Sequence, residues 1–341
     1  MAEQGRWENG KAVCEAGSRG YRLWVPTGYD TRVAAPLVVM LHGCRQKAED
    51  LARISGMNDV AGKNNFLVVY PEQTIRGNPF RCWNWFEARH QLRGMGEPAI
   101  LAAVVERVRA FHNVDAERIH VAGISAGAAM AVTLGVTYPE VFSAAGMVAG
   151  LEFAAANGVL SGLKAMKQGG PDPNQQGVVA FEAMRPVLGK NSRRRMPIIV
   201  FQGEADSTVH PANADQLIEQ WAMTNHLLAA EDGKYPNWAV EVTCGAVPDG
   251  YAYQKSAYKD PAGRLLMEKW MVKGLDHAWP GSPVAAEYSD PRGPNASEEM
   301  WRFFCQATAE PLAGGAHKTF WGRSSELVHG AGRLFNKLLG R

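Results

Sequence analysis

Three side chains of this sequence have the types and the order that acyl transfer through a serine requires. Ser125 stands in Gly123-Ile-Ser-Ala-Gly127, Asp206 follows 81 residues later, and His277 lies a further 71 residues on. A serine hydroxyl is a poor nucleophile until a histidine takes its proton, and an acid fixes the tautomer of that histidine and stabilises its cation. The order Ser, Asp, His therefore predicts a nucleophile, an orienting acid and a general base.

The residues around Ser125 predict a sharp turn between a strand and a helix. The run Ile119–Ala122 precedes the pentapeptide, and Ala128-Ala-Met-Ala-Val follows it. Glycines on both sides of the serine let backbone segments approach where a Cβ would not fit, and such a strand–turn–helix setting is that of a nucleophile elbow. The alternative is a helix of small residues that simply starts here and packs on a sheet.

Asp206 and His277 both lie on loops that follow strand-like runs, where open α/β sheets place their sites. Glu204 and Asp276 are rival acids. Asp276 adjoins His277 and is badly placed to reach its far ring nitrogen, while Glu204 lies nearer the strand, so we favour Asp206. The alternative for His277 is a loop histidine packed on Trp279.

An oxyanion hole needs two backbone N–H groups aimed at the attacked carbonyl. We expect one from Ala126, directly after the serine, and the other from Cys44 in the loop His42-Gly43-Cys44. The alternative is that His42 and Gly43 only end a strand.

The elements that would position these groups alternate along the chain. Short β-branched runs predict strands at Pro36–Met40, Phe66–Tyr70, Arg118–Ala122 and Pro197–Gln202, and Glu97–His112 has the apolar stripe of a helix. Strands separated by helices predict an α/β fold with a mostly parallel central sheet and helices on both faces.

The remaining segments are less regular. Residues 11–26 read as two edge strands, 151–195 as an excursion or cap between strands, and 239–273 as two strands around a turn. A last helix is expected from Asn295, with Glu298 as its capping-box partner. We expect residues 1–310 to form one catalytic domain and residues 311–341 a tail, with a short amphipathic helix in it.

Composition excludes several classes of protein. Among 341 residues, 36 basic and 34 acidic side chains give a net charge of +2, which argues against nucleic acid as the partner. No apolar run of about 18 residues predicts a transmembrane segment, and the first residues show no secretory signal. There is no C-x-x-C or H-E-x-x-H motif, so we expect no metal site.

Several motifs in order resemble the esterases of the polyhydroxybutyrate depolymerase family. They are Leu41-His-Gly-Cys-Arg-Gln46, Arg81-Cys-Trp-Asn-Trp-Phe86, Gly123-Ile-Ser-Ala-Gly127, Gly203-Glu-Ala-Asp206, His277-Ala-Trp-Pro-Gly281 and Tyr288–Ser297. The resemblance covers about residues 20–305 and implies an α/β-hydrolase that cleaves esters without a cofactor. Its relatives include short-chain polyhydroxyalkanoate depolymerases and feruloyl or acetylxylan esterases.

The resemblance also implies a disulfide between Cys44 and Cys82, which would tether the loop that bears an oxyanion donor. The alternative is two reduced cysteines. A disulfide favours an extracellular or periplasmic protein, with the cytoplasm left open. Arg45 departs from the small polar residue expected there and places a cation near the site.

Substrate contacts are harder to assign. Trp83, Trp85 and Trp279 are candidates to line the acyl or alcohol side, and each could equally be core. A second group, Arg93, Glu97 and Asn84, is expected to form a buried polar network that supports the site loops.

The expected function is that of a serine esterase for short-chain carboxylic esters, first of all polyhydroxyalkanoate oligomers or polymer. Attack on solid polymer is left open, because no polymer-binding domain follows the core. The alternatives are a feruloyl or acetylxylan esterase, a peptidase on the same scaffold, and a non-catalytic binding module.

Overall fold

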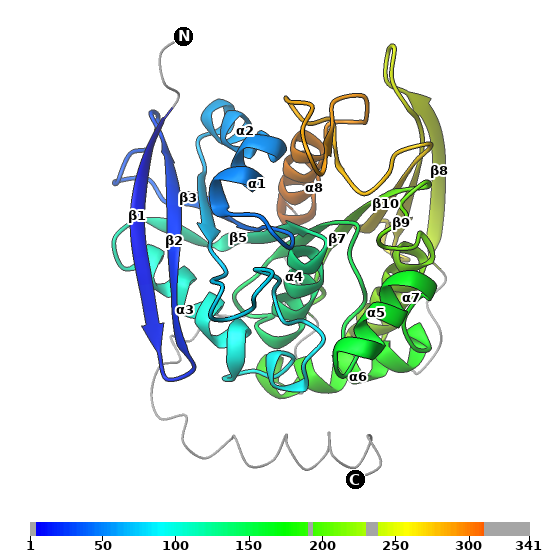
Figure 1. The fold of residues 1–341 in the computed structure, drawn as a ribbon, viewed down its shortest axis with the longest axis horizontal. Coiled ribbons are helices and arrows are strands. Elements are labelled where there is room, and N and C mark those ends of the chain that lie inside the picture. Colours follow the sequence, from blue (N-terminus) through cyan, green and yellow to red (C-terminus); the bar gives the residue numbers. More distant parts are fainter. Residues whose placement is uncertain (1–4, 190–193, 230–237, 310–341) are drawn as a thin grey trace.

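A ten-stranded sheet runs through the residues that the computed structural model describes, 5–189, 194–229 and 238–309 (Figure 1). Its strand order is β1-β2-β4-β3-β5-β6-β7-β10-β9-β8. The strands are β1 (Gly5–Cys14), β2 (Gly17–Pro26), β3 (Ala35–Leu41), β4 (Leu67–Pro71), β5 (Val114–Ile124), β6 (Ala144–Val148), β7 (Ile198–Gly203), β8 (Ala239–Ala246), β9 (Ala252–Lys259) and β10 (Leu265–Val272). A small parallel pair joins β11 (Trp279–Pro280) to β12 (Ser289–Asp290).

The centre of the sheet is parallel and its edges are antiparallel. Parallel pairing runs from β4 through β3, β5, β6 and β7 to β10. Figure 1 shows the β1–β2 hairpin at one edge and the β8–β9 hairpin at the other, both antiparallel. Every residue of β3, β4, β6 and β7 is buried, so both faces of these strands are covered. The expected α/β architecture is confirmed.

The helices are α1 (Ala48–Ser55), α2 (Met57–Asn64), a 3₁₀ turn η1 (Ala88–His90), α3 (Gly96–Arg109), α4 (Ala126–Thr137), α5 (Val159–Gln168), α6 (Pro173–Leu188), α7 (Ala212–Ala229) and α8 (Ala296–Ala309). Helix α4 is buried at every position, which its small side chains allow. Helix α8 packs on β5, where Phe304 stacks on His120 at 4.6 Å between ring centroids.

The segments outside the parallel centre hold more regular structure than the sequence predicts. The first hairpin begins at Gly5, earlier than expected, and residues 239–273 form three strands instead of two, with β9 and β10 flanking the expected turn. The excursion at 151–195 contains α5 and α6. Strand β6 was not expected, because Ala144-Ala-Gly-Met-Val148 lacks the β-branched run that marks its neighbours.

The last described helix starts where the sequence predicts. The Asn295 side chain accepts a hydrogen bond from the N–H of Glu298 at 3.1 Å, so Asn295 caps α8. The predicted tail, 311–341, lies outside the described residues. Among the described helices, none is long and apolar enough to cross a membrane.

Candidate active site

Ser125 occupies the turn between β5 and α4. Its φ of 57° and ψ of −122° are costly for a residue with a side chain, by about 1–3 kcal/mol, and such strain is typical of functional sites. The N–H of Ser125 donates to Val148 O at 2.9 Å, which ties the turn to the end of β6. Ser125 itself is partly exposed. The elbow that the sequence predicts is present in the structure.

The glycines beside Ser125 are required by close backbone contacts. A Cβ on Gly127 would lie 2.0 Å from Leu41 O, and a Cβ on Gly123 would lie 2.6 Å from Gly127 O. Real Cβ atoms do not approach backbone oxygens this closely, so α4 can begin against the end of β3 only with glycine at both positions.

The structure brings Asp206 and His277 together. His277 Nδ1 lies 2.8 Å from Asp206 Oδ2, and both side chains are buried. The other carboxylate oxygen, Asp206 Oδ1, accepts the N–H groups of Thr208 and Val209, each at 2.8 Å. A third group, Gln202 Nε2, donates to Asp206 Oδ2 at 3.2 Å. Because two backbone donors hold Oδ1, the carboxylate presents Oδ2 to the imidazole in one orientation.

The loops that carry this pair touch because β7 and β10 are neighbours in the sheet. A Cβ on Gly203, the last residue of β7, would lie 2.2 Å from Leu275 O. The N–H of Ala205 donates to the same Leu275 oxygen at 3.0 Å. The two loops therefore cross in direct backbone contact.

The rival acids do not approach the imidazole nitrogen that Asp206 holds. Glu204 is exposed and joins the loop only through its backbone N–H, which donates to Val272 O at 2.9 Å. Asp276 accepts the N–H of Ser207 at 3.0 Å, and this hydrogen bond lowers the pKa of the Asp276 carboxyl. Asp276 thus braces the loop of Asp206, and Asp206 is the carboxylate that contacts His277 Nδ1.

Ser125 and the Asp206–His277 pair lie along one edge of the sheet. Ser125 follows β5, Asp206 follows β7 and His277 follows β10, each at the carboxyl end of a strand in the parallel centre. Backbone bonds link these ends in turn, since Ala149 N donates to Phe201 O at 2.9 Å. This edge is where open α/β sheets hold their sites.

The loop after β3, residues 42–46, presents the predicted oxyanion donor. Gly43 N donates to Gln46 Oε1 at 2.8 Å, and Arg45 N donates to Phe80 O at 2.7 Å. Within the described parts of the chain, the N–H groups of Cys44 and Ala126 have no acceptor. Ala126 is the first residue of α4, where helix N–H groups are unsatisfied by the helix itself. Both N–H groups are therefore free to donate hydrogen bonds to a substrate oxygen.

His42 holds this loop from beneath. Its Nδ1 lies 2.8 Å from Gly43 O, and its Nε2 accepts the N–H of Gln73 at 3.0 Å. Complete burial lowers the pKa of His42 to about 4, so the ring is neutral at pH 7. Neutral His42 with its proton on Nδ1 satisfies both contacts.

The predicted disulfide is present. Cys44 and Cys82 are joined, with 4.2 Å between their Cα atoms, while Cys14, Cys244 and Cys305 are free thiols. The bond links the 42–46 loop to the segment that follows Arg81.

Of the three tryptophans proposed for substrate contact, two have no exposed surface. Trp83 and Trp279 are 0% exposed and Trp85 is 5% exposed. Trp83 Nε1 donates to His42 O at 3.0 Å, so this buried indole supports the 42–46 loop. A pocket role for Trp83 and Trp279 is therefore not supported by their burial. An indole that fills a core and one that lines a pocket look the same in a sequence.

The predicted network of Arg93, Glu97 and Asn84 forms only in part. Glu97 and Asn84 are hydrogen-bonded, but Arg93 instead donates to Thr137 O and pairs with Glu140. The cation that meets Glu97 is Arg19, at 3.3 Å.

Sequence reasoning missed two further residues near the site. Gln202 binds Asp206, and Tyr288 lies edge-on to His277 with 6.1 Å between ring centroids. A polar residue at the end of the otherwise apolar run of β7 was the available signal for Gln202.

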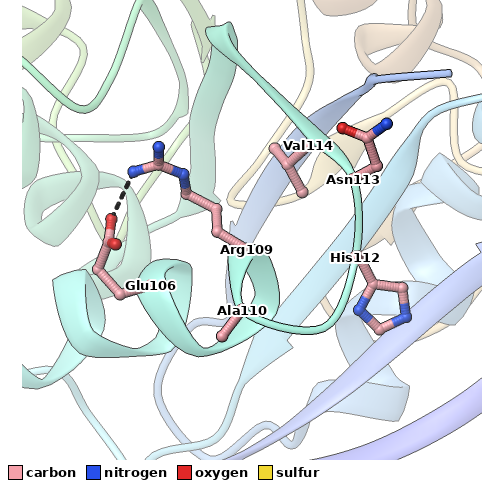
Figure 2. A pocket seen from close by; sticks show the side chains of 6 residues that line it. All are labelled: Glu106, Arg109, Ala110, His112, Asn113 and Val114. Carbon is pink, nitrogen blue, oxygen red and sulfur yellow. Dashed lines mark hydrogen bonds and ion pairs between the residues drawn. The ribbon is translucent and has the colours of Figure 1, made fainter. Parts of the chain in front are cut away.

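A surface hollow of about 380 Å³ lies elsewhere, between the end of α3 and the start of β5 (Figure 2). It is lined by Glu106, Arg109, Ala110, His112, Asn113 and Val114, and Figure 2 shows the ion pair between Glu106 and Arg109. The start of β5 is at the sheet edge opposite Ser125, so this hollow does not belong to the candidate site. In the described residues, no cluster of three or more His, Cys, Asp or Glu side chains could hold a metal ion.

The sheet, the elbow and the positions of Asp206 and His277 define an α/β-hydrolase. Solved structures share the fold. An acetyl xylan esterase from Aspergillus awamori matches with a TM-score of 0.64 at 18% identity, covering 87% of this chain and 98% of that one. A feruloyl esterase module from Clostridium thermocellum, complexed with sinapinate, matches with a TM-score of 0.56 at 13% identity, covering 94% and 93% of the two chains.

A family model described as Esterase PHB depolymerase matches residues 19–239, and the chain belongs to this family. Poly(3-hydroxyalkanoate) depolymerase C of Paucimonas lemoignei is 32% identical over 260 residues, which are 76% of this chain and 58% of that protein. A probable acetylxylan esterase A of Aspergillus fumigatus is 30% identical over 208 residues, 59% of this chain and 53% of that protein. The chain thus spans less than two thirds of the length of either relative.

Proposed function

We propose that this protein is a serine esterase that hydrolyses short-chain carboxylic esters, first of all polyhydroxyalkanoate oligomers or polymer. The observation that carries the proposal is the 2.8 Å contact between His277 Nδ1 and Asp206 Oδ2, at the sheet edge where Ser125 occupies the elbow. Membership of the Esterase PHB depolymerase family supports the same reading.

The chemistry has two halves. In the first, His277 takes the proton of Ser125 Oγ, the oxygen attacks the ester carbonyl, and the alcohol leaves with a proton from His277. In the second, His277 takes a proton from water as the water oxygen attacks the acyl carbonyl; the bond from that carbon to Ser125 Oγ then breaks, and His277 returns the proton to Oγ. Asp206 keeps the imidazole in the tautomer whose Nε2 can accept a proton. The N–H groups of Cys44 and Ala126 stabilise the oxyanion in both halves.

The polyhydroxyalkanoate assignment takes its support from Poly(3-hydroxyalkanoate) depolymerase C, which matches 76% of this chain at 32% identity. A second candidate is a plant polysaccharide ester, because curated relatives matching 59% of this chain carry the names acetylxylan esterase and feruloyl esterase. The two candidates share the mechanism and differ in the substrate that fits beside Ser125.

The test is hydrolysis of p-nitrophenyl acetate and butyrate by the purified chain and by Ser125→Ala. We expect turnover by the wild type, its loss in the variant, and inactivation by a serine-reactive phosphonate. Full activity in Ser125→Ala would exclude the mechanism, and an inactive wild type that still binds esters would favour a binding module.

Hydroxybutyrate oligomers, solid polyhydroxybutyrate, methyl ferulate and acetylated xylan should then be compared by kcat/KM. Faster cleavage of hydroxybutyrate oligomers than of the plant esters is the expected result. The reverse order would assign the enzyme to plant esters.

We further propose an extracellular or periplasmic location, supported by the Cys44–Cys82 disulfide. Residues 1–310 are proposed to act as one catalytic domain and 311–341 as a C-terminal tail. Thiol counting in unreduced, denatured protein should find three free thiols, and five would contradict the disulfide. A chain ending at residue 310 should keep the kcat of the full chain.

A further inference from the structure

Glu97 is a buried carboxylate that accepts hydrogen bonds from side chains and backbone at once. It is 0% exposed and lies in the first turn of α3. Its Oε2 accepts the N–H of Asn84 at 2.7 Å, and its Oε1 accepts Asn84 Nδ2 at 2.7 Å and Gln73 Nε2. Arg19 supplies a countercharge at 3.3 Å.

These contacts hold both ends of one stretch of chain, residues 73–84. Gln73 begins it and Asn84 ends it, and Gln73 Nε2 also donates to Cys82 O at 3.1 Å. Asn84 Nδ2 further donates to Gly77 O at 3.2 Å, inside the stretch. The 73–84 segment is therefore gathered around a single carboxylate.

The same segment makes the contacts that hold the oxyanion loop, residues 42–46. The N–H of Gln73 donates to His42 Nε2, and Trp83 Nε1 donates to His42 O, each at 3.0 Å. Phe80 O accepts the N–H of Arg45 at 2.7 Å. The disulfide adds a covalent link from residue 82 to residue 44.

Every one of these links has its second end in the 73–84 segment, so a displacement of that segment would displace the loop. A disulfide to a mobile segment would restrain Cys44 little. The segment contains little regular structure of its own, and the carboxylate at the start of α3 connects it to a helix.

We propose that Glu97 is a positioning residue for ester hydrolysis, acting through the 73–84 segment to fix the Cys44 N–H in the oxyanion hole. The inference rests on the proposed esterase function and deepens it. Glu97 does not touch the substrate, and its effect reaches the reaction by way of Gln73, Cys82 and Asn84.

Glu97→Gln is the direct test, because it keeps the size of the side chain and places an amide where donors now converge. We expect kcat for p-nitrophenyl acetate to fall about ten- to a hundred-fold, the scale of a displaced catalytic group. The oxyanion forms in acylation and in deacylation, so both rates fall together and KM stays within about threefold.

The matched control is Glu268→Gln. Glu268 is also buried and hydrogen-bonded, to Trp270 Nε1 at 3.2 Å and to Arg302, but it lies in β10 well before the strand end that leads to His277. It should lose thermal stability without losing kcat. If both variants lose stability and neither loses kcat, Glu97 is only structural and the proposal is wrong.

Two further measurements keep the outcomes separate. Gln73→Met removes the side-chain hydrogen bonds to Glu97 and Cys82 and keeps the backbone N–H that donates to His42. If Glu97→Gln does not fold, Gln73→Met replaces it as the test and should also lower kcat. Dithiothreitol should reduce Cys44–Cys82 faster in Glu97→Gln than in Glu268→Gln, and equal rates would count against the proposal. The rate of disulfide reduction can be measured on an inactive protein. An inactive wild type would therefore refute the esterase function without deciding whether Glu97 positions the loop.

Discussion

Replacing Asp206 with asparagine puts an amide nitrogen in place of one carboxylate oxygen, and the hydrogen bonds of Asp206 determine which oxygen is replaced. Oδ1 accepts two backbone N–H groups at 2.8 Å, so the carbonyl oxygen of the new amide must take that place. The amide nitrogen then occupies the Oδ2 position and faces His277 Nδ1 and Gln202 Nε2. The amide would donate to Nδ1, which moves the imidazole proton to Nε2.

An imidazole with its proton on Nε2 cannot take the proton of Ser125. In triads of this chemistry the wrong tautomer lowers kcat by about 10⁴-fold, which corresponds to about 5 kcal/mol of activation free energy. Both backbone bonds to Oδ1 survive, so we expect the melting temperature to change by only a few degrees.

The assay is kcat for p-nitrophenyl butyrate, with Asp276→Asn as the control. Asp276 is exposed, and its Oδ1 accepts Ser207 N, a contact that an amide oxygen can keep. Its kcat should stay within about threefold, as for other exposed polar changes of under about 0.5 kcal/mol. A loss below tenfold in Asp206→Asn, or a larger loss in Asp276→Asn, would refute the assignment of the acid.

Three other changes test further features of the structure. Gly127→Ala should lower the free energy of unfolding by about 3 kcal/mol or more, since its Cβ would lie 2.0 Å from Leu41 O; an unchanged melting temperature would contradict this contact. Cys82→Ser should lower the free energy of unfolding by up to about 4 kcal/mol, and denaturant titration with and without reductant measures it; equal midpoints for variant and oxidised wild type would argue against the tether. Glu152 is buried without a hydrogen-bond partner in the described residues, and burial raises its pKa from 4.5 to about 8. The folded state then binds more protons than the unfolded state between these values, so wild-type stability should fall as the pH rises from about 4.5 to about 8. Glu152→Gln should remove this pH dependence. If the difference in melting temperature between pH 5 and pH 9 is the same for the wild type and for Glu152→Gln, the predicted contribution of Glu152 is excluded.

The strands of the parallel centre were predictable because burial on both faces leaves a continuous apolar run, as in β3 and β7. The elbow was predictable because backbone contacts at Gly123 and Gly127 leave no room for a Cβ, so glycine must stand at both positions. Strand β6 was not predictable, because its mostly small residues have little β-propensity and form a strand only through pairing with β5 and β7.

Long-range side-chain partners lay beyond the sequence. Glu97 pairs with Arg19, 78 residues away, and not with the nearby Arg93, because β2 and α3 meet only in the folded chain. Asp206 could be preferred over Asp276 by reach alone, since a residue cannot easily turn back to the far nitrogen of the histidine beside it. The hydrogen bonds that orient its carboxylate required the structure.

The backbone contact at Gly203 means that the Asp206 loop and the His277 loop keep their relative position only when both are present. With 2.2 Å between a Cβ at this position and Leu275 O, any larger residue would push apart the two loops whose side chains must stay 2.8 Å from each other. A designer who grafts the Asp206 loop onto another scaffold must carry the His277 loop and the β7–β10 pairing with it. Substitutions at the exposed Glu204 leave this contact unchanged, whereas any side chain at Gly203 would clash with Leu275 O.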